Sequence, residues 1–135
     1  MQTLAGAIST ATHGTGRNLP CLSAEIRGVR MITGTGAEMK ISTDEHADLL
    51  PAVQVALGTL GVLTGIKMQL IDRHKLHRRV WFAPYDEVLA NAKRLWADNR
   101  NYEFFYLPFS NTAMCITHNL TEAACTPAWR ASALG

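Results

Sequence analysis

The first sixteen residues of the chain contain few large apolar side chains and many small or hydroxyl-bearing ones. Gly6, Gly14 and Gly16 are spread through this N-terminal run, and His13 lies among hydroxyl residues near its end. Glycine lets the backbone approach a ligand closely, and free backbone N–H groups and hydroxyls can donate to phosphate or ring carbonyl groups. The run has too little apolar bulk to build a core. It therefore predicts a backbone cradle for a phosphorylated cofactor, with an ordinary surface loop as the alternative.

The spacing of these glycines excludes two common phosphate-binding motifs. The sequence contains no Gly-x-x-x-x-Gly-Lys-Ser/Thr pattern, so a P-loop is not supported. The glycines of the run also do not form Gly-x-Gly-x-x-Gly, the fingerprint of dinucleotide-binding domains.

The composition indicates a globular protein without a strongly charged surface. Apolar residues make up 47% of the chain, and 13 basic against 11 acidic residues leave a net charge of +2. This balance favours neither nucleic acid nor an anionic membrane as a partner. The three cysteines form no Cys-x-x-Cys pair, so we expect a reducing, cytoplasmic compartment, and no metal-ligand spacing occurs. The uncharged segment 49–66 is broken by proline and glycine, which favours a helix, a turn and a strand over a membrane span.

Hydrophobic periodicity predicts mixed helix and strand structure. We expect strands at 24–33 and 37–42 joined by a hairpin turn at 34–36. A helix over 44–57 would begin at a Ser42–Glu45 capping box, and Pro51 would either kink this helix or begin its second part. Further strands are expected at 61–71, 74–82, 102–108 and 112–119. Between them, Pro84 should start a helix whose apolar stripe comprises Tyr85, Val88, Leu89, Ala92, Leu95 and Trp96.

Strict alternation assigns faces to two of these strands. The first, at 61–71, should place on one face Val62, Thr64, Ile66, Met68 and Leu70. In the second, at 74–82, the apolar face would be Leu76, Val80 and Phe82. The neighbours of these residues form a basic cluster that reads either as a binding patch or, more simply, as the solvated face of a strand. This cluster consists of His74, Lys75, His77, Arg78 and Arg79.

Four segments, in this order along the chain, resemble segments of a known enzyme family. The run that ends Thr-His-Gly-Thr-Gly at residues 12–16 resembles the second flavin-contacting segment of the FAD-linked oxidases of the vanillyl-alcohol oxidase type. Residues 29–38 resemble the strand, glycine turn and strand that follow in that family, and residues 47–64 the helix that leads into its Leu-Gly-x-Leu-Gly-Val-x-Thr turn. Residues 102–109 resemble the aromatic strand that opens the substrate domain of the gulonolactone and arabinonolactone oxidases.

The resemblance implies an α+β fold in two parts. Residues 1–72 would be the C-terminal part of a PCMH-type FAD-binding domain, an antiparallel sheet with helices. Residues 73–135 would begin an α+β substrate-capping domain. The Gly-rich loop with which the family grips the FAD pyrophosphate has no counterpart in the sequence. We therefore expect a fragment, with the remainder of a parent polypeptide as its partner.

The resemblance also implies which residues hold FAD. Backbone donors from Ala11 to Gly16 are expected to bind the cofactor, and the turn at Gly61 would touch its adenosine side. His13 would either donate to the flavin or only fix its own loop, and a glycine turn before a buried strand needs no ligand. No catalytic residue and no metal ligand can be named. The predicted cofactor-binding residues are Thr3, Gly6, Ile8, Ala11, Thr12, His13, Gly14, Thr15, Gly16, Gly61 and Val62.

By this resemblance the chain comes from an FAD-dependent oxidoreductase that oxidises the CH–OH group of a sugar-derived lactone or alditol, with oxygen or another acceptor. A non-catalytic fragment or binding module that keeps half of the flavin-domain fold is the alternative from a different functional class. An enzyme of the same fold acting on a hydroxy acid or an aromatic alcohol is a third possibility.

Overall fold

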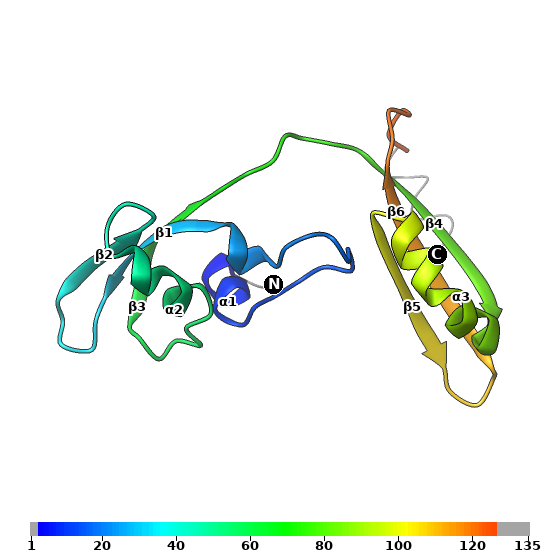
Figure 1. The fold of residues 1–135 in the computed structure, drawn as a ribbon, viewed down its shortest axis with the longest axis horizontal. Coiled ribbons are helices and arrows are strands. Elements are labelled where there is room, and N and C mark those ends of the chain that lie inside the picture. The colour runs from blue at the N-terminus through cyan, green and yellow to red at the C-terminus, as the bar shows by residue number, and fades with distance from the viewer. Residues whose placement is uncertain (1–2, 127–135) are drawn as a thin grey trace. The chain divides into compact units, whose positions relative to one another are not determined.

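The computed structural model describes residues 3–126. The described part of the chain divides into two compact units, the first formed by residues 3–14 and 19–71 and the second by residues 15–18 and 72–126. Each unit contains an antiparallel three-stranded sheet and at least one helix (Figure 1). The predicted α+β class is therefore confirmed. Within the described range, no helix is long and apolar enough to cross a membrane.

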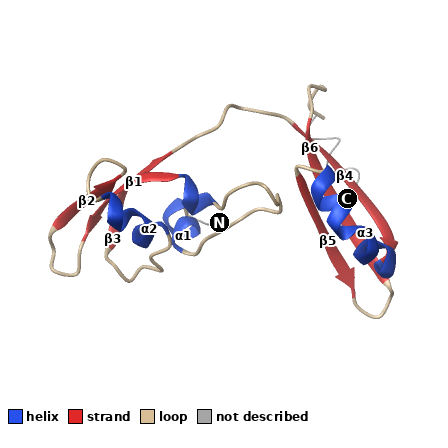
Figure 2. Ribbon diagram, in the orientation of Figure 1, coloured by secondary structure: helices blue, strands red, loops and turns tan. Residues whose placement is uncertain are grey.

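The sheet of the first unit has the strand order β2-β1-β3. The predicted hairpin joins β1 to β2, and its turn is closed by Gly36, which has a φ of 82° and donates its N–H to the Thr33 oxygen at 2.9 Å. Two helices and two 3-10 turns complete the unit (Figure 2). In chain order its elements are α1 (Leu4–Ser9), η1 (Leu22–Glu25), β1 (Ile26–Ile32), β2 (Glu38–Ser42), η2 (Ala47–Leu49), α2 (Leu50–Gln54) and β3 (Val62–Met68).

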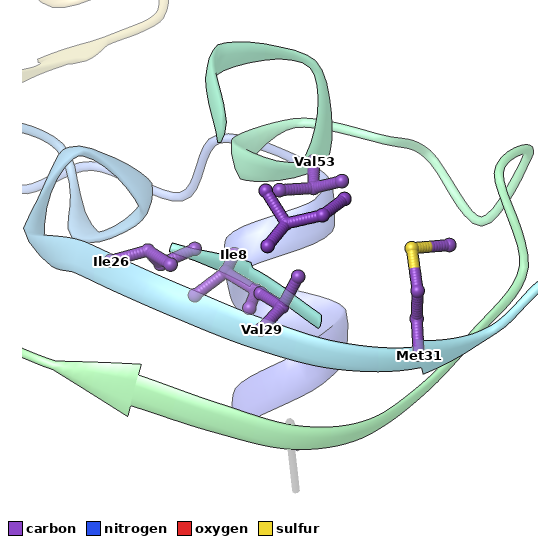
Figure 3. Packing of buried hydrophobic residues seen from close by; sticks show 6 residues of the cluster. Ile8, Ile26, Val29, Met31 and Val53 are labelled. Atoms are coloured by element: carbon purple, nitrogen blue, oxygen red, sulfur yellow. The ribbon is translucent and has the colours of Figure 1, made fainter. Parts of the chain in front are cut away.

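The N-terminal run contributes to the core of this unit, contrary to the expectation that it has too little apolar bulk. Residues 4–9 form helix α1, and Ile8 is fully buried on it. Figure 3 shows Ile8 and Val53 meeting over the buried face of β1. One isoleucine at the right position on a short helix is sufficient, because Ala7 beside it is small enough to pack closely. The core cluster comprises Ile8, Ile26, Val29, Met31, Ile41 and Val53.

The predicted capping box closes a turn instead of opening a helix. The Ser42 hydroxyl accepts the N–H of Glu45 at 3.1 Å, and Ser42 donates its own N–H to the Glu45 oxygen at 2.7 Å. His46 then adopts a left-handed conformation with a φ of 55°, which no helix can continue through. Helix α2 therefore begins only at Leu50, with Pro51 in its first turn, so the second of the two alternatives for this proline is correct.

The predicted face of the strand at 61–71 is wrong because β3 contains an irregularity in its pairing. Arg30 pairs with Gly65 and Met31 pairs with Leu63, so Thr64 is an extra residue on β3. Such a bulge breaks the alternation of side chains along a strand. As a result Leu63 and Ile66 both pack against the core, whereas Val62 is 68% exposed.

The second unit has the strand order β4-β6-β5 and one long helix. The predicted helix is confirmed, and its stripe buries Val88 and Ala92. Val88 packs against Tyr102 and Cys115 of the sheet. Burial, together with the Cys115 thiol 3.6 Å away, raises the pKa of the Tyr102 hydroxyl above its usual range. The elements are β4 (Leu76–Pro84), α3 (Tyr85–Asp98), β5 (Asn101–Leu107) and β6 (Thr112–Leu120).

The apolar face predicted for the strand at 74–82 is not the face that helix α3 covers. Trp81 and Ala83 of β4 pack against the core of the second unit, whereas Val80 and Phe82 are 42% and 62% exposed. Alternation identifies which residues share a face, but both faces of β4 carry apolar side chains near Pro84. The face that the helix covers is decided by the chain direction after Pro84, which the pattern within the strand does not contain.

Replacing Ile8 with alanine should lower the free energy of unfolding of the first unit by about 2–5 kcal/mol, because it leaves a cavity in a core with few members. Leu4→Ala, on the same helix but 48% exposed, should change it by less than about 1 kcal/mol. Urea unfolding followed by circular dichroism measures both. Equal losses in the two variants would show that α1 is not anchored through Ile8.

Candidate functional site

A pocket of about 420 Å³ opens in the first unit between helix α1, the loop that follows α2, and the start of β3. It brings together two stretches that lie about fifty residues apart in the sequence and that were both predicted to contact a cofactor. Its lining residues are Ala5, Gly6, Ser9, Thr10, Met31, Val53, Ala56, Leu57, Gly58, Leu60, Gly61, Val62 and Leu63.

The loop at 55–61 is held in place by its own hydrogen bonds and by one bond to α1. Leu57 donates its N–H to the Ser9 oxygen at 3.2 Å, which joins the loop to the end of α1. Thr59 donates both its N–H and its hydroxyl to the Ala56 oxygen, at 2.9 and 2.7 Å. Leu57 and Gly58 have φ values of 51° and 75°, so two consecutive left-handed residues reverse the chain here.

Gly61 is required at its position by the packing of the strand behind it. Its φ is 141°, and a Cβ atom there would collide with the backbone oxygen of Ile32 and lie 2.9 Å from Met31 Cε. Only glycine lets the loop approach β1 this closely. Gly61 therefore sets how closely the loop packs on β1 at the base of the pocket. This packing agrees with the alternative from the sequence, that a glycine turn before a buried strand needs no ligand.

The chemistry of the lining favours a neutral ligand. Most of the walls are aliphatic, from Met31, Val53, Leu60 and Leu63, and none of the lining side chains is titratable. The Thr10 hydroxyl already donates to the Gly6 oxygen at 3.0 Å. With no lysine or arginine in the lining, the pocket fits a heterocyclic ring and its sugar better than a diphosphate. It can hold such a group but supplies no acid or base.

Three of the predicted cofactor-binding residues line this pocket: Gly6, Gly61 and Val62. Two other predicted residues, Thr3 and Ile8, do not line the pocket but stabilise helix α1, which forms one of its walls. The Thr3 hydroxyl accepts the Gly6 N–H at 3.1 Å and so caps α1. Ile8 is buried in the core and does not line the pocket.

The predicted residues from Ala11 onward do not line the pocket. Ala11 turns the chain with a φ of 54°, and Thr12 N–H donates to the Ala7 oxygen at 3.0 Å. His13 Nδ1 lies 3.0 Å from the oxygen of Gly14, a contact within its own loop. Thr15 and Gly16 group with the second unit. Their role in cofactor binding stays a prediction.

Sequence reasoning missed ten of the thirteen lining residues of the pocket. Ser9 and Thr10 belong to the N-terminal run but were read as loop, and Leu57, Gly58 and Leu60 were recognised as part of the glycine turn but not named as cofactor-binding residues. The Leu-Gly-x-Leu-Gly pattern at residues 57–61 was the available signal, since paired glycines around a leucine mark a tight turn with an exposed apolar side chain. Among the described residues, no group of His, Cys, Asp or Glu side chains is arranged to hold a metal ion.

Comparison with known proteins identifies relatives along nearly the whole chain, although no model of a protein family matches it. L-gulono-1,4-lactone dehydrogenase of Mycobacterium tuberculosis is 33% identical over 131 residues, which are 96% of this chain and 30% of the relative. Mitochondrial L-galactono-1,4-lactone dehydrogenase of Brassica oleracea is 27% identical over 118 residues, 87% of the chain and 20% of the relative. D-arabinono-1,4-lactone oxidase of Debaryomyces hansenii is 25% identical over 114 residues, 84% of the chain and 20% of the relative.

The chain thus spans only a fifth to three tenths of the length of these relatives. All three are named for the oxidation of a sugar-derived 1,4-lactone, the branch that the four sequence segments resemble. The chain is therefore homologous to a segment of the sugar-1,4-lactone oxidases and dehydrogenases.

Proposed function

We propose that the chain is part of an FAD-dependent oxidoreductase that acts on a sugar-derived 1,4-lactone, and that the pocket of the first unit holds the adenosine half of FAD. The position and lining of this pocket support its assignment to the adenosine half of FAD. It joins the N-terminal run to the Gly61 turn, the two stretches whose family resemblance implied FAD contacts. Its aliphatic, uncharged lining suits an adenine ring and its ribose.

In this proposal the first unit is the C-terminal part of a PCMH-type FAD-binding domain and the second begins the substrate-capping domain. FAD, when bound, supplies the hydride acceptor for the CH–OH group of the lactone. The residues of the chain would position the cofactor. The 55–61 loop and α1 would enclose its adenosine half, and Gly61, which has no side chain, lets the loop lie close against β1 at the base of the pocket. The pyrophosphate would be held outside this pocket, because no cation lines it. The remainder of the polypeptide would supply that contact and complete the substrate site.

The alternative, a non-catalytic module that keeps the nucleotide-binding half of the fold, rests on one observation. The pocket contains no titratable side chain that could move a proton. The two functions differ in whether the reading frame around residues 1–135 encodes the rest of the enzyme. A Gly-rich loop encoded upstream favours the oxidoreductase, and a stop codon in frame on both sides favours the module.

A chimera tests the catalytic proposal directly. This chain would replace the matching 131-residue segment of the Mycobacterium tuberculosis L-gulono-1,4-lactone dehydrogenase. We expect the folded chimera to carry flavin, and its flavin absorbance to bleach when L-gulono-1,4-lactone is added without oxygen, which separates reduction from the choice of acceptor. A chimera that is folded by circular dichroism but carries no flavin, or whose flavin no lactone bleaches, would contradict the proposal. The unmodified relative is the control.

A further inference from the structure

A second concave site lies in the second unit, where the chain enters β4 and leaves β6. This basic cleft has a volume of about 530 Å³ and plays no part in the proposed function. It contains most of the basic cluster, which the sequence explained most simply as a solvated strand face. Its lining residues are Arg73, His74, Lys75, Leu76, His77, Arg78, Thr121, Ala123, Ala124, Cys125 and Thr126.

Backbone pairing gives the basic cleft a defined shape. Leu76 pairs with Leu120 and His77 with Asn119, so the two walls are joined where the strands meet. Beyond the last strand pair, Thr121 N–H donates to the Lys75 oxygen at 3.1 Å. The Lys75 Nζ atom donates across the cleft to the backbone oxygen of Glu122 at 3.3 Å. The cations therefore all lie on the wall formed by residues 73–78, and the opposite wall, residues 121–126, supplies hydroxyl and backbone groups.

The cations of the cleft lack acidic partners among residues 3–126. The ion pairs of this part of the chain join Arg27 to Glu25, Arg30 to Glu38, and Arg94 to Asp98. None involves the three cations of the cleft, Arg73, Lys75 and Arg78. Like charges held close together repel one another, and an anion bound between them removes that cost.

We propose that the basic cleft binds a compact, soluble polyanion that carries phosphate groups. Arginine and lysine donate charge-assisted hydrogen bonds to phosphate oxygens, and histidine N–H groups and threonine hydroxyls add further donors. The Thr121 hydroxyl accepts the Ala123 N–H at 3.2 Å and so keeps its own hydrogen available to donate. The lining contains no Phe, Tyr or Trp ring on which a nucleoside base could stack, and its charged groups match phosphate oxygens, so we expect the phosphate to be the recognised group.

Isothermal titration of the 135-residue chain with inorganic tripolyphosphate tests this site. We expect saturable binding that weakens as sodium chloride is raised. Arg73→Gln combined with Arg78→Gln should weaken binding at least about tenfold, because each removes charge-assisted hydrogen bonds to the ligand. The matched control, Lys40→Gln with Lys93→Gln, makes the same change in net charge at two exposed residues outside the cleft. It should change binding by less than about twofold.

Three results would overturn the proposal: no heat of binding by the wild-type chain up to about 5 mM tripolyphosphate, an equal loss in the matched control, or equal affinity for citrate. The first result is obtained with the wild-type chain and so does not depend on whether a variant folds. Circular dichroism verifies that the variants are folded. Adenosine carries no phosphate and reports only on the pocket of the first unit, so failure of this site and failure of the proposed function are distinguishable.

Discussion

Replacing Gly61 with alanine should unfold the first unit. The added Cβ atom would collide with the backbone oxygen of Ile32 and lie 2.9 Å from Met31 Cε, and a φ of 141° is strained for any residue with a side chain. The obstacle is the backbone of a central strand, which cannot move aside without breaking the sheet. We expect a loss of at least about 3 kcal/mol, a large share of the stability of a domain of this size.

Gly58→Ala is the matched control for this variant. Gly58 lies in the same loop and also has a positive φ, 75°, but a Cβ atom there would meet nothing within 4 Å. Its cost should be only the conformational strain, about 1 kcal/mol. Urea unfolding of both variants measures the difference. If Gly61→Ala were as stable as Gly58→Ala, the loop would not pack on β1 as described.

The second large effect concerns FAD, which the 135-residue chain should bind weakly or not at all and with which it should oxidise no lactone. The pocket has no cation to bind the diphosphate. Each charge-assisted hydrogen bond that is missing removes roughly 1.5–3 kcal/mol, so a few of them weaken binding by several orders of magnitude. Quenching of flavin fluorescence measures the affinity. Submicromolar binding, or a yellow protein with lactone oxidase activity, would show the expectation to be wrong.

Residual FAD binding could come from the basic cleft of the second unit through the pyrophosphate. The Arg73→Gln, Arg78→Gln variant separates the two contributions, since it leaves the pocket of the first unit unchanged. Binding that persists in this variant belongs to the pocket.

The sequence predicted the elements of the fold better than their faces. The hairpin at 34–36 and the helix after Pro84 follow from local signals, a glycine turn and an apolar stripe that runs from Tyr85 to Trp96. The faces of β3 and β4 do not, because a bulge at Thr64 and the chain reversal after Pro84 decide them. Helix α2 starts late for a similar reason: the left-handed His46 interrupts a pattern that looks helical in sequence.

The glycine residues of the candidate site could be predicted from the sequence, because glycine patterns indicate turns and close approaches of the backbone. Gly6 and Gly61 were named from the sequence, and they mark two of the three walls. The third wall depends on a hydrogen bond between Leu57 and Ser9, and the Leu-Gly-x-Leu-Gly pattern that begins at Leu57 does not indicate which residue of α1 it meets. Contacts of this kind, between segments far apart in the chain, follow from the tertiary fold and not from local propensity.

The most direct test of the proposed cofactor site is a titration of the 15N-labelled chain with adenosine, followed through its amide spectrum. We expect millimolar affinity and shifts concentrated at Gly6, Gly58 and Gly61, which line the pocket. Ala56→Leu, which fills the pocket, should abolish these shifts, whereas Ala52→Leu, exposed on α2 and outside the lining, should preserve them. Unchanged amides at all three glycines up to about 10 mM adenosine, or shifts that Ala56→Leu leaves intact, would contradict a cofactor site in this pocket.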